Sequence, residues 1–263
     1  MTALDVLAWG IAGSVRDTGR RGLAHLGRSR GGAVDLASLE LGNRLVGNPV
    51  HVAGLESSGG LVLRTRRPVL VAVTGSPCDV TVVDGPPLGW GAPVALPSDA
   101  TVRIGRLHGG ARSYVCVRGG VVAVDGDRLD VGADPGTEAA SQPAVPPRLE
   151  VPVRVWPGPR LDWFARGALD ALVAGPWTVS VTSDRVGVRL DGPSLVRVRH
   201  GELPSEGMVE GAIQVPPDGR PIVMLADHPA TGGYPVVAVV DPADLWLVAQ
   251  RPPGSEVRFT RPR

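Results

Sequence analysis

Short apolar segments rich in valine alternate with Gly- and Pro-containing turns along most of the chain. This pattern is typical of strands joined by tight turns. In the first half it predicts strands at residues 4–9, 61–64, 69–75, 79–85, 100–107 and 111–120. The last segment alternates, with Tyr114, Cys116 and Arg118 on one face, which indicates a sheet with one solvated face.

The second half shows the same pattern. It predicts strands at residues 151–156, 177–182, 187–190, 194–199, 211–215, 221–227 and 256–260. The segments 211–215 and 221–227 are separated by Pro216-Pro217-Asp218-Gly219, a sequence suited to a hairpin turn. The apolar segment 221–226 leads into DHPATGGYP at 227–235, where two glycines and a proline interrupt the strand pattern before VVAVV resumes.

Helical periodicity is confined to three segments. Asp35 is a suitable N-cap for a helix that runs to about Val46. Apolar residues recur at i, i+3, i+4 and i+7 from Leu161 to Val173, where Gly175-Pro176 ends the pattern. Asp241 and Pro242 are placed as N-cap and first residue of a helix over 241–250.

The segment 134–150, DPGTEAASQPAVPPRLE, has no hydrophobic period and is typical of a linker. We therefore predict an N-terminal β subdomain at 1–133, a linker at 134–150 and a C-terminal β subdomain at 151–263. The strand-rich halves, each with one or two helices, predict a mainly β fold of two barrel-like subdomains with a few short helices.

The composition excludes several kinds of chemistry. With 36 Gly and 26 Pro, a helical bundle is disfavoured, and a net charge of +1 without long charge runs suggests neither nucleic acid nor a membrane surface as a partner. All 27 basic residues are arginine, so a Schiff-base lysine, a P-loop lysine and covalently attached biotin or lipoate are excluded in this chain.

The two cysteines and five histidines do not show metal-site spacing, so we expect no metal site and two packed thiols rather than a disulfide. The N-terminal segment lacks the basic and apolar regions of a signal peptide, and no apolar run is long enough to span a bilayer. We expect a soluble, cytoplasmic protein.

Three loops carry the polar residues that could perform chemistry. The first is Arg16–Gly22 with His25 and Arg30, where arginines beside glycines can hold a carboxylate or phosphate, although such runs are usually solvated basic loops. The second is 200–207 with Gln214, whose carboxylates and histidine suit proton transfer or, equally, the capping of turns.

The third loop is the interruption at 227–235. Gly232 and Gly233 permit close approach of backbone to a ligand, and Thr231 and Tyr234 can each donate and accept a hydrogen bond. Alternatively, the two glycines form a bulge and Tyr234 packs against the sheet. The residues alone leave both interpretations open.

Six stretches in order along nearly the whole chain resemble the allophanate hydrolase subunit 2 family, which includes the KipI antagonist and the C subunit of 5-oxoprolinase. They are RDTGRRGLAHLGRSRGGAVDLASLELGNRLVGNP, GLESSGGLVLR, RSYVCVRGG, SDRVGVRLDG, LPSEGMVEGAIQVPPDGRPIVMLADHPATGGYPVVAVV and DLWLVAQRPPGSEVRF. The resemblance implies two cyclophilin-like β-barrel subdomains, as in biotin-dependent carboxyltransferase subdomains A and B.

The resemblance also implies an activity and partners. The activity is ATP-dependent opening of 5-oxo-L-proline to L-glutamate. It would be performed in complex with a homologous subunit 1, which is KipI-like and corresponds to the B subunit of 5-oxoprolinase, and with a third partner, the A subunit of 5-oxoprolinase. ATP would be used by the complex, with nothing bound covalently to this chain.

On this resemblance we assign candidate roles to fourteen residues. The candidates for catalysis are Asp17, His25, Glu202, Glu206, Asp227 and Tyr234. The candidates for substrate binding are Arg20, Asp35, Asn43, Ser205, Gln214, Thr231, Gly232 and Gly233. Asp35 has a helix N-cap as its alternative role, and Asn43 a position on the helix face.

Two other functions stay open. The first is carboxyl transfer to urea or a related amide, for which biotin would have to be carried by another chain. The second is a non-catalytic regulatory role like that of the KipI antagonist. It is favoured by a departure from the family, because the chain passes from Gly120 through VVAV to DGDRLDVG where relatives have a long loop.

Overall fold

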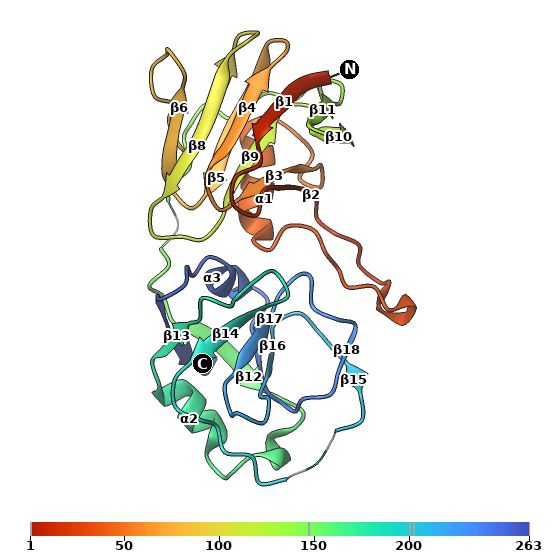
Figure 1. The fold of residues 1–263 in the computed structure, drawn as a ribbon, viewed down its shortest axis with the longest axis vertical. Helices are drawn as coiled ribbons and strands as arrows, with labels where there is room; N and C mark the ends of the chain where they lie inside the picture. The colour runs from red at the N-terminus through yellow and green to blue at the C-terminus, as the bar shows by residue number, and fades with distance from the viewer. Residues whose placement is uncertain (1, 147, 200, 202, 263) are drawn as a thin grey trace. The chain divides into compact units, whose positions relative to one another are not determined.

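The computed structural model describes residues 2–146, 148–199, 201 and 203–262. The chain divides into two compact units, one formed by Met1–Thr18 and Asp35–Pro147 and the other by Gly19–Val34 and Arg148–Arg263 (Figure 1). Residues 19–34, which the sequence placed with the first half, thus belong to the second unit. The predicted subdomain and linker boundaries stay a prediction.

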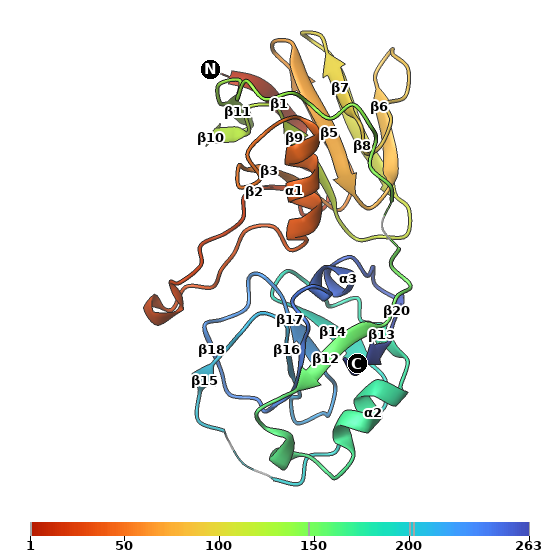
Figure 2. The same cartoon turned by 180° about the vertical axis from the view of Figure 1, so that it is seen from behind.

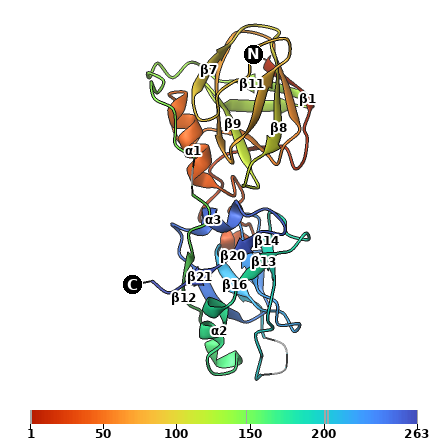
Figure 3. The same cartoon turned by 90° about the vertical axis from the view of Figure 1, so that its left-hand side faces the viewer.

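The first unit consists of two antiparallel sheets with a shared core. The order in one sheet is β10 (Val121–Asp125), β11 (Arg128–Val131), β1 (Thr2–Ala8), β4 (Leu61–Thr65), β8 (Thr101–Leu107) and β6 (Cys78–Val82). The order in the other is β2 (Ser14–Arg16), β3 (Gly54–Ser57), β9 (Ser113–Val117), β5 (Val69–Gly75) and β7 (Pro93–Leu96). Alternate apolar residues of both sheets, such as Leu4, Ile104, Leu55 and Val115, pack into one buried cluster, which the strands surround in Figure 3.

Helix α1 (Leu36–Leu45) lies against β5 and β9 of this unit (Figure 2). A Cβ atom on Gly42 would lie 2.6 Å from the Cys116 sulfur and 3.0 Å from Thr74 Oγ1, so only glycine allows the helix this close to the sheet. The Thr74 hydroxyl donates to the Ser38 carbonyl over 2.7 Å and ties the helix to β5.

The second unit is built on one strongly curved sheet. Its order is β20 (Glu256–Val257), β13 (Trp177–Val179), β14 (Gly187–Asp191), β17 (Ile222–Met224), β16 (Ala212–Gln214), β19 (Val236–Val240), β12 (Val153–Pro157) and β21 (Phe259–Thr260). Because only Arg258 separates the two outermost strands, β20 and β21, the sheet nearly closes into a barrel. Helices α2 (Ala168–Ala174) and α3 (Leu245–Ala249) contribute Leu172 and Val248 to its core.

The predicted mainly β fold with barrel-like subdomains and a few short helices is confirmed. Strands β2, β3, β7, β10 and β11, and the two-residue strands β15 (Glu206–Gly207) and β18 (Thr231–Gly232), lie outside the predicted segments. Each of these strands has at most five residues, too few to show a clear period of two. Their pairing with neighbouring strands, rather than their own sequence, sets their conformation.

The continuous helix predicted over Leu161–Val173 is wrong. A 3-10 turn, η2 (Leu161–Trp163), comes first, Phe164 is extended, and α2 begins only after Gly167, which has φ 87°. The reason is tertiary, because Phe164 forms a β-bridge with Arg197 and Ala165 donates its N–H to the Val196 carbonyl over 2.9 Å.

The strand predicted at 194–199 is wrong for the same reason. Arg197 makes an isolated bridge, while Leu195 N–H donates to Gly219 and Val198 N–H to Trp163, so the segment follows no single neighbouring strand among the described residues. The last helix also begins later than predicted, at Leu245 with Asp244 as its N-cap, rather than at Pro242 with Asp241 as its N-cap. Asp241 instead accepts from Ala243 N–H over 3.0 Å in a turn that precedes it.

Candidate functional site

Two of the three polar loops meet in the second unit. β15 (Glu206–Gly207) and β18 (Thr231–Gly232) form a two-stranded ladder in which Glu206 opposes Gly232 and Gly207 opposes Thr231. Met208 N–H extends the ladder by donating to the Ala230 carbonyl over 2.9 Å. Two loops far apart in sequence are therefore neighbours, as a site built from both requires.

The interruption in the strand pattern, Thr231–Tyr234, presents polar groups to solvent. Thr231, Gly233 and Tyr234 are exposed, and 45% of Tyr234 is accessible. Tyr234 therefore lies at the surface of the second unit and not in its core. Two hydroxyl groups and the adjoining backbone form a polar surface where a small ligand can find both donors and acceptors.

The buried side chain of Gln214 holds this segment in place through a hydrogen bond. Gln214 Nε2 donates to the Tyr234 carbonyl over 3.0 Å. A Cβ atom on Gly232 would lie 2.6 Å from that nitrogen and 2.5 Å from Met208 Cε, so Gly232 lets the β18 backbone approach β16. Gln214 is therefore a positioning residue for the loop.

Glu206 is held by an arginine from outside the predicted set. Arg160 Nε donates to Glu206 Oε2 over 3.0 Å, and a second guanidinium nitrogen contacts Oε1. Arg160 N–H also donates to the Val236 carbonyl over 3.2 Å, which anchors it beside β19. The pair fixes the direction of the Glu206 carboxylate.

Asp227 lies in a second ion pair. Arg185 Nε donates to Asp227 Oδ2 over 2.8 Å, and its Nη2 donates to the Gly32 carbonyl. The guanidinium thereby connects the end of the β17 strand to the segment 19–34. Asp227 faces this segment, and its Oδ1 lies 3.9 Å from the position of a Cβ atom on Gly31.

The segment 19–34 is further held by Arg30 and Glu210. Arg30 Nε and Nη2 donate to the two Glu210 oxygens over 2.8 and 2.7 Å, and Gly31 N–H donates to the Ala226 carbonyl over 2.9 Å. Both side chains of this bidentate pair are largely buried. The loop of residues 20–28, with 3-10 turn η1 (Ala24–Leu26) at its end, projects from these anchors (Figure 2).

Arg20 and His25 are exposed on this projecting loop. Arg20 contributes its N–H to the Arg30 carbonyl over 2.7 Å, so its backbone is fixed while its side chain reaches solvent. Ser205 is exposed in the second unit as well. Glu202 lies outside the described residues.

Three candidates belong to the first unit. Asp17 is exposed directly after β2. Asp35 is fully buried and caps α1, accepting from Ser38 N–H over 3.0 Å and from the Ser38 hydroxyl. Asn43 is also fully buried, and its Nδ2 donates to the carbonyls of Val50 and Val52. For Asp35 and Asn43 the observed contacts match the structural roles that the sequence offered as alternatives.

Sequence reasoning missed the arginines that hold the carboxylates, Arg160 and Arg185, as well as Glu210. Arg185 lies within SDRVGVRLDG, one of the stretches that carried the family resemblance, so that signal was available. Glu210 likewise lies within the stretch LPSEGMVEGAIQV, whereas Arg160 lies outside all six stretches, and its partner Glu206 is distant in the sequence. Among the described residues, no cluster of three or more His, Cys, Asp or Glu side chains is arranged to hold a metal ion.

Comparison with known proteins identifies the family. The model of the carboxyltransferase domain, subdomain A and B, matches residues 26–125 and 122–261. The chain belongs to this family. The predicted resemblance is thereby confirmed. No helix in the described part of the chain combines the length and apolar character needed to cross a membrane.

Several carboxyltransferase-domain proteins are similar over the whole chain. The C subunit of the 5-oxoprolinase of Escherichia coli is 32% identical, with 98% of this chain and 91% of that protein aligned. The C subunit of the Haemophilus influenzae 5-oxoprolinase is 30% identical. The putative urea carboxylase of Emericella nidulans is 28% identical, and 24% of its length is aligned.

Solved structures show the same fold. The crystal structure of TTHA0988 superposes with a TM-score of 0.88 at 36% identity, covering 99% of this chain. This chain spans 55% of the TTHA0988 chain. The Kluyveromyces lactis urea carboxylase also gives a TM-score of 0.88, at 25% identity and over 27% of its length. The predicted fold class is thus shared with carboxyltransferase-domain proteins.

Proposed function

We propose that this chain is a component of an ATP-dependent 5-oxoprolinase that opens 5-oxo-L-proline to L-glutamate. The proposal rests chiefly on the 32% identity that extends over 91% of the C subunit of the E. coli 5-oxoprolinase. Related proteins with that name are components of an enzyme, which supports an enzyme complex as the setting of this chain. The proposed partners are a homologous subunit 1, equivalent to the B subunit of 5-oxoprolinase, and a third protein equivalent to the A subunit.

The proposed substrate site is the surface around β15 and β18. The Thr231 and Tyr234 hydroxyls and the N–H group of Gly233 can donate to the lactam carbonyl of 5-oxoproline. Gln214 keeps this segment in place through the Tyr234 carbonyl. Arg20 is the proposed partner of the substrate carboxylate, which an exposed guanidinium can bind with two parallel hydrogen bonds.

In this proposal, carboxylate side chains and one imidazole transfer the protons. Ring opening adds one water across the lactam C–N bond, so one group must take a proton from water and one must give a proton to the leaving nitrogen. The candidates that belong to the second unit are His25, Glu202, Glu206 and Asp227. Hydrolysis of ATP by the complex consumes a second water and supplies the driving force.

The test measures ATP hydrolysis by this chain purified with its subunit-1 homologue, with and without 5-oxoproline. Glutamate is followed after the third protein is added. We expect 5-oxoproline to stimulate ATP hydrolysis, and Tyr234→Phe and Arg20→Ala each to reduce the stimulation at least tenfold, which corresponds to about 1.4 kcal/mol. Arg21→Ala, a change at the neighbouring exposed arginine, is the control. A stable complex that ignores 5-oxoproline contradicts the proposal.

Carboxyl transfer to urea or a related amide is the second candidate. The carboxyltransferase-domain match and the 28% identity to a putative urea carboxylase favour it. Since the chain contains no lysine, biotin would have to arrive on another polypeptide. Stimulation of ATP use by urea, dependent on a biotin carrier, would distinguish this function from the first.

A regulatory role without turnover is the third candidate. After Gly120 the chain forms a tight hairpin of β10 and β11, in which Asp125 opposes Arg128. This compact connection lies where the family pattern has a long loop. A binding protein of this kind would form a tight complex with its homologous partner, and neither 5-oxoproline nor urea would change ATP hydrolysis by that complex.

A further inference from the structure

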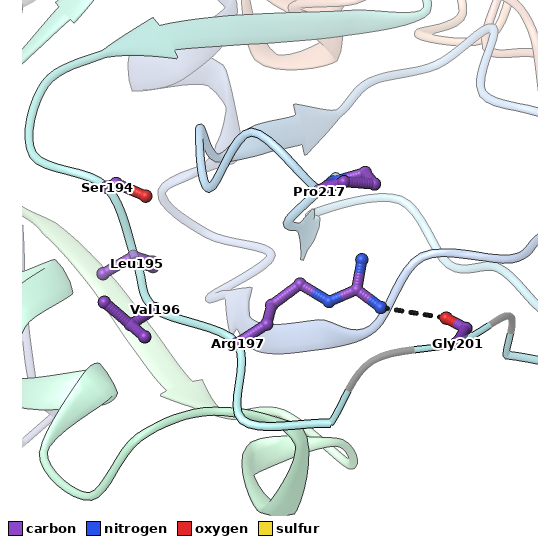
Figure 4. A pocket seen from close by; sticks show the side chains of 6 residues that line it. All are labelled: Ser194, Leu195, Val196, Arg197, Gly201 and Pro217. Atoms are coloured by element: carbon purple, nitrogen blue, oxygen red, sulfur yellow. Dashed lines mark hydrogen bonds between the residues drawn. The ribbon is translucent and has the colours of Figure 1, made fainter.

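An arginine that has no carboxylate partner among the described residues faces a cavity in the second unit. The cavity has a volume of about 340 Å³ and is lined by Ser194, Leu195, Val196, Arg197, Gly201 and Pro217. Figure 4 shows the Arg197 guanidinium directed into the space between Pro217 and Gly201. None of these residues belongs to the proposed 5-oxoproline site.

The Arg197 backbone is rigidly placed. Its bridge to Phe164 and the hydrogen bond from Val198 N–H to the Trp163 carbonyl, 2.9 Å long, fix the chain on one side. Leu195, only 2% exposed, anchors it in the core on the other, and its N–H donates to the Gly219 carbonyl. The long side chain therefore starts from a fixed point, which limits the entropy lost on binding a ligand.

The guanidinium is also oriented by an aromatic ring. Its central carbon lies 5.5 Å from the centroid of the Trp163 ring, within cation–π range. Nη2 makes a long hydrogen bond of 3.3 Å to the Gly201 carbonyl. An anion would bind through the remaining N–H groups of the guanidinium.

The charge of Arg197 is not balanced by any described carboxylate. Asp162 pairs with Arg199 over 3.0 Å, and Asp191 pairs with Arg220 over 3.1 Å. The Asp218 carboxylate accepts from Arg220 N–H over 3.0 Å. Within the described residues, the Arg197 Nε is buried without a hydrogen-bond partner. Such groups are rare in folded proteins, because each costs about 1–3 kcal/mol of stability.

Ser194 adds a hydroxyl to the wall of the cavity. Among the described residues, its Oγ makes one long hydrogen bond of 3.4 Å, to the Asp218 carbonyl. A Cβ atom on Gly219, which has φ 78°, would lie 1.9 Å from that oxygen, so glycine is required for the serine to occupy this place. Pro217 supplies an apolar surface opposite.

We infer that this cavity is a binding site for a small oxyanion, either a carboxylate or a phosphate group. Arg197 would form charge-assisted hydrogen bonds to the anion, and Ser194 would donate one more. The volume lies at the small end of the range for ligand pockets, so the ligand is a metabolite-sized molecule rather than a chain of residues.

The inference is tested by isothermal titration calorimetry on the full chain, at constant ionic strength in chloride. Sodium phosphate, sodium L-glutamate and 5-oxo-L-proline are the probes, and they distinguish phosphate from carboxylate ligands. We expect at least one probe to bind, Arg197→Gln to weaken that binding at least tenfold, and Arg197→Lys to weaken it less, because the charge stays while the planar fork is lost.

Arg166→Gln is the matched control, since Arg166 is an exposed arginine of the same unit. This variant should bind the probe as tightly as the unmodified chain does. Ser194→Ala is a second, smaller change to the same cavity, and it should weaken binding several-fold. It tests the inference independently if Arg197→Gln proves unstable. If none of the three probes binds at about 20 mM, roughly ten times the dissociation constant of a typical weak site, the inference is overturned. Binding that survives Arg197→Gln but is lost in Tyr234→Phe also overturns it, because that binding would belong to the proposed 5-oxoproline site.

Discussion

Two buried polar residues of the first unit, Asp35 and Asn43, were candidates for substrate binding, and the structure shows both in stabilising contacts. Asp35 and Asn43 are each fully buried, and their observed contacts are with backbone groups and neighbouring side chains. Tyr114 joins this network, accepting from Asp35 N–H over 2.9 Å and donating to Glu56 over 2.8 Å. Burial of the phenol raises the pKa of Tyr114 well above its usual value, so the donor proton is retained.

Replacement of Asp35 by alanine should lower the free energy of unfolding by about 2 kcal/mol. The change removes the cap of α1 and leaves Ser38 N–H without its acceptor in a buried site. Urea denaturation followed by circular dichroism measures the loss. Asp125→Ala, at an exposed aspartate in the same unit, should change the free energy by less than about 0.5 kcal/mol. Equal effects of the two changes would contradict the capping role.

The two thiols should be inert in the folded protein. Burial raises the pKa of Cys78 and of Cys116 from 9.0 to about 12, so neither thiolate is populated at about pH 8. The Ellman reagent should label neither cysteine in native buffer and both in urea. A rapid native reaction of either thiol would show that it is accessible as the thiolate.

The same raised pKa values set the direction of the pH dependence. The unfolded chain ionises its thiols first, so the stability that the neutral thiols contribute is complete below pH 9. It is lost as the pH rises from about 9 to about 12. The free energy of unfolding should therefore fall over this range, and Cys116→Ala should make the fall less steep.

At the scale of elements, short ladders and close backbone contacts shape the candidate site. The β15–β18 ladder contains only two residue pairs, and it is supported by Gln214 and Met208 beneath Gly232. Short strands of this kind depend on such packing, because their own hydrogen bonds contribute little net stability.

Gly232→Ala and Gly233→Ala form a matched pair for this element. A new Cβ atom on Gly232 would meet Met208 Cε at 2.5 Å and Gln214 Nε2 at 2.6 Å, whereas the nearest atom to one on Gly233 is the Leu203 carbonyl oxygen at 3.4 Å. Gly232→Ala should destabilise the protein by about 1–2 kcal/mol, and Gly233→Ala by much less. Thermal unfolding compares them, and a reversed order would show that the site tolerates displacement of β18.

At the scale of the whole molecule, the two compact units do not follow the order of the chain. Residues 19–34 lie in the first half of the sequence but belong to the second unit. Their anchors are Arg30 on Glu210 and Arg185 on Gly32, contacts that join residues far apart in the sequence. The exposed loop with Arg20 and His25 is therefore positioned by these anchors in the second unit.

Arg30→Ala should loosen this segment. It removes a largely buried bidentate ion pair and leaves the Glu210 carboxylate without this partner. Hydrogen exchange of the Gly31 amide, which donates to Ala226, should become roughly tenfold faster, as expected from a loss of about 1.4 kcal/mol. Arg28→Ala, an exposed neighbour, is the control. Unchanged exchange in Arg30→Ala would show that the backbone contacts alone hold the segment.

The sequence by itself determined the fold class, most of the longer strands and the α1 helix with its Asp35 cap, because these depend on local periodicity and on side chains that bond to nearby backbone. It also determined the family, through stretches spread along the chain. The Leu161–Val173 helix and the 194–199 strand were wrong, since the bridge between Phe164 and Arg197 overrode local preference.

Only the tertiary structure decided which polar residues are neighbours. It joined 206–207 to 231–232, paired Glu206 with Arg160 and Asp227 with Arg185, and placed 19–34 in the second unit. It also placed Arg197, which the sequence predicted only as part of a strand, in the wall of a cavity. The physical reason is that ion pairs and cavities arise from long-range packing, and no periodicity in the chain encodes which distant side chains will meet.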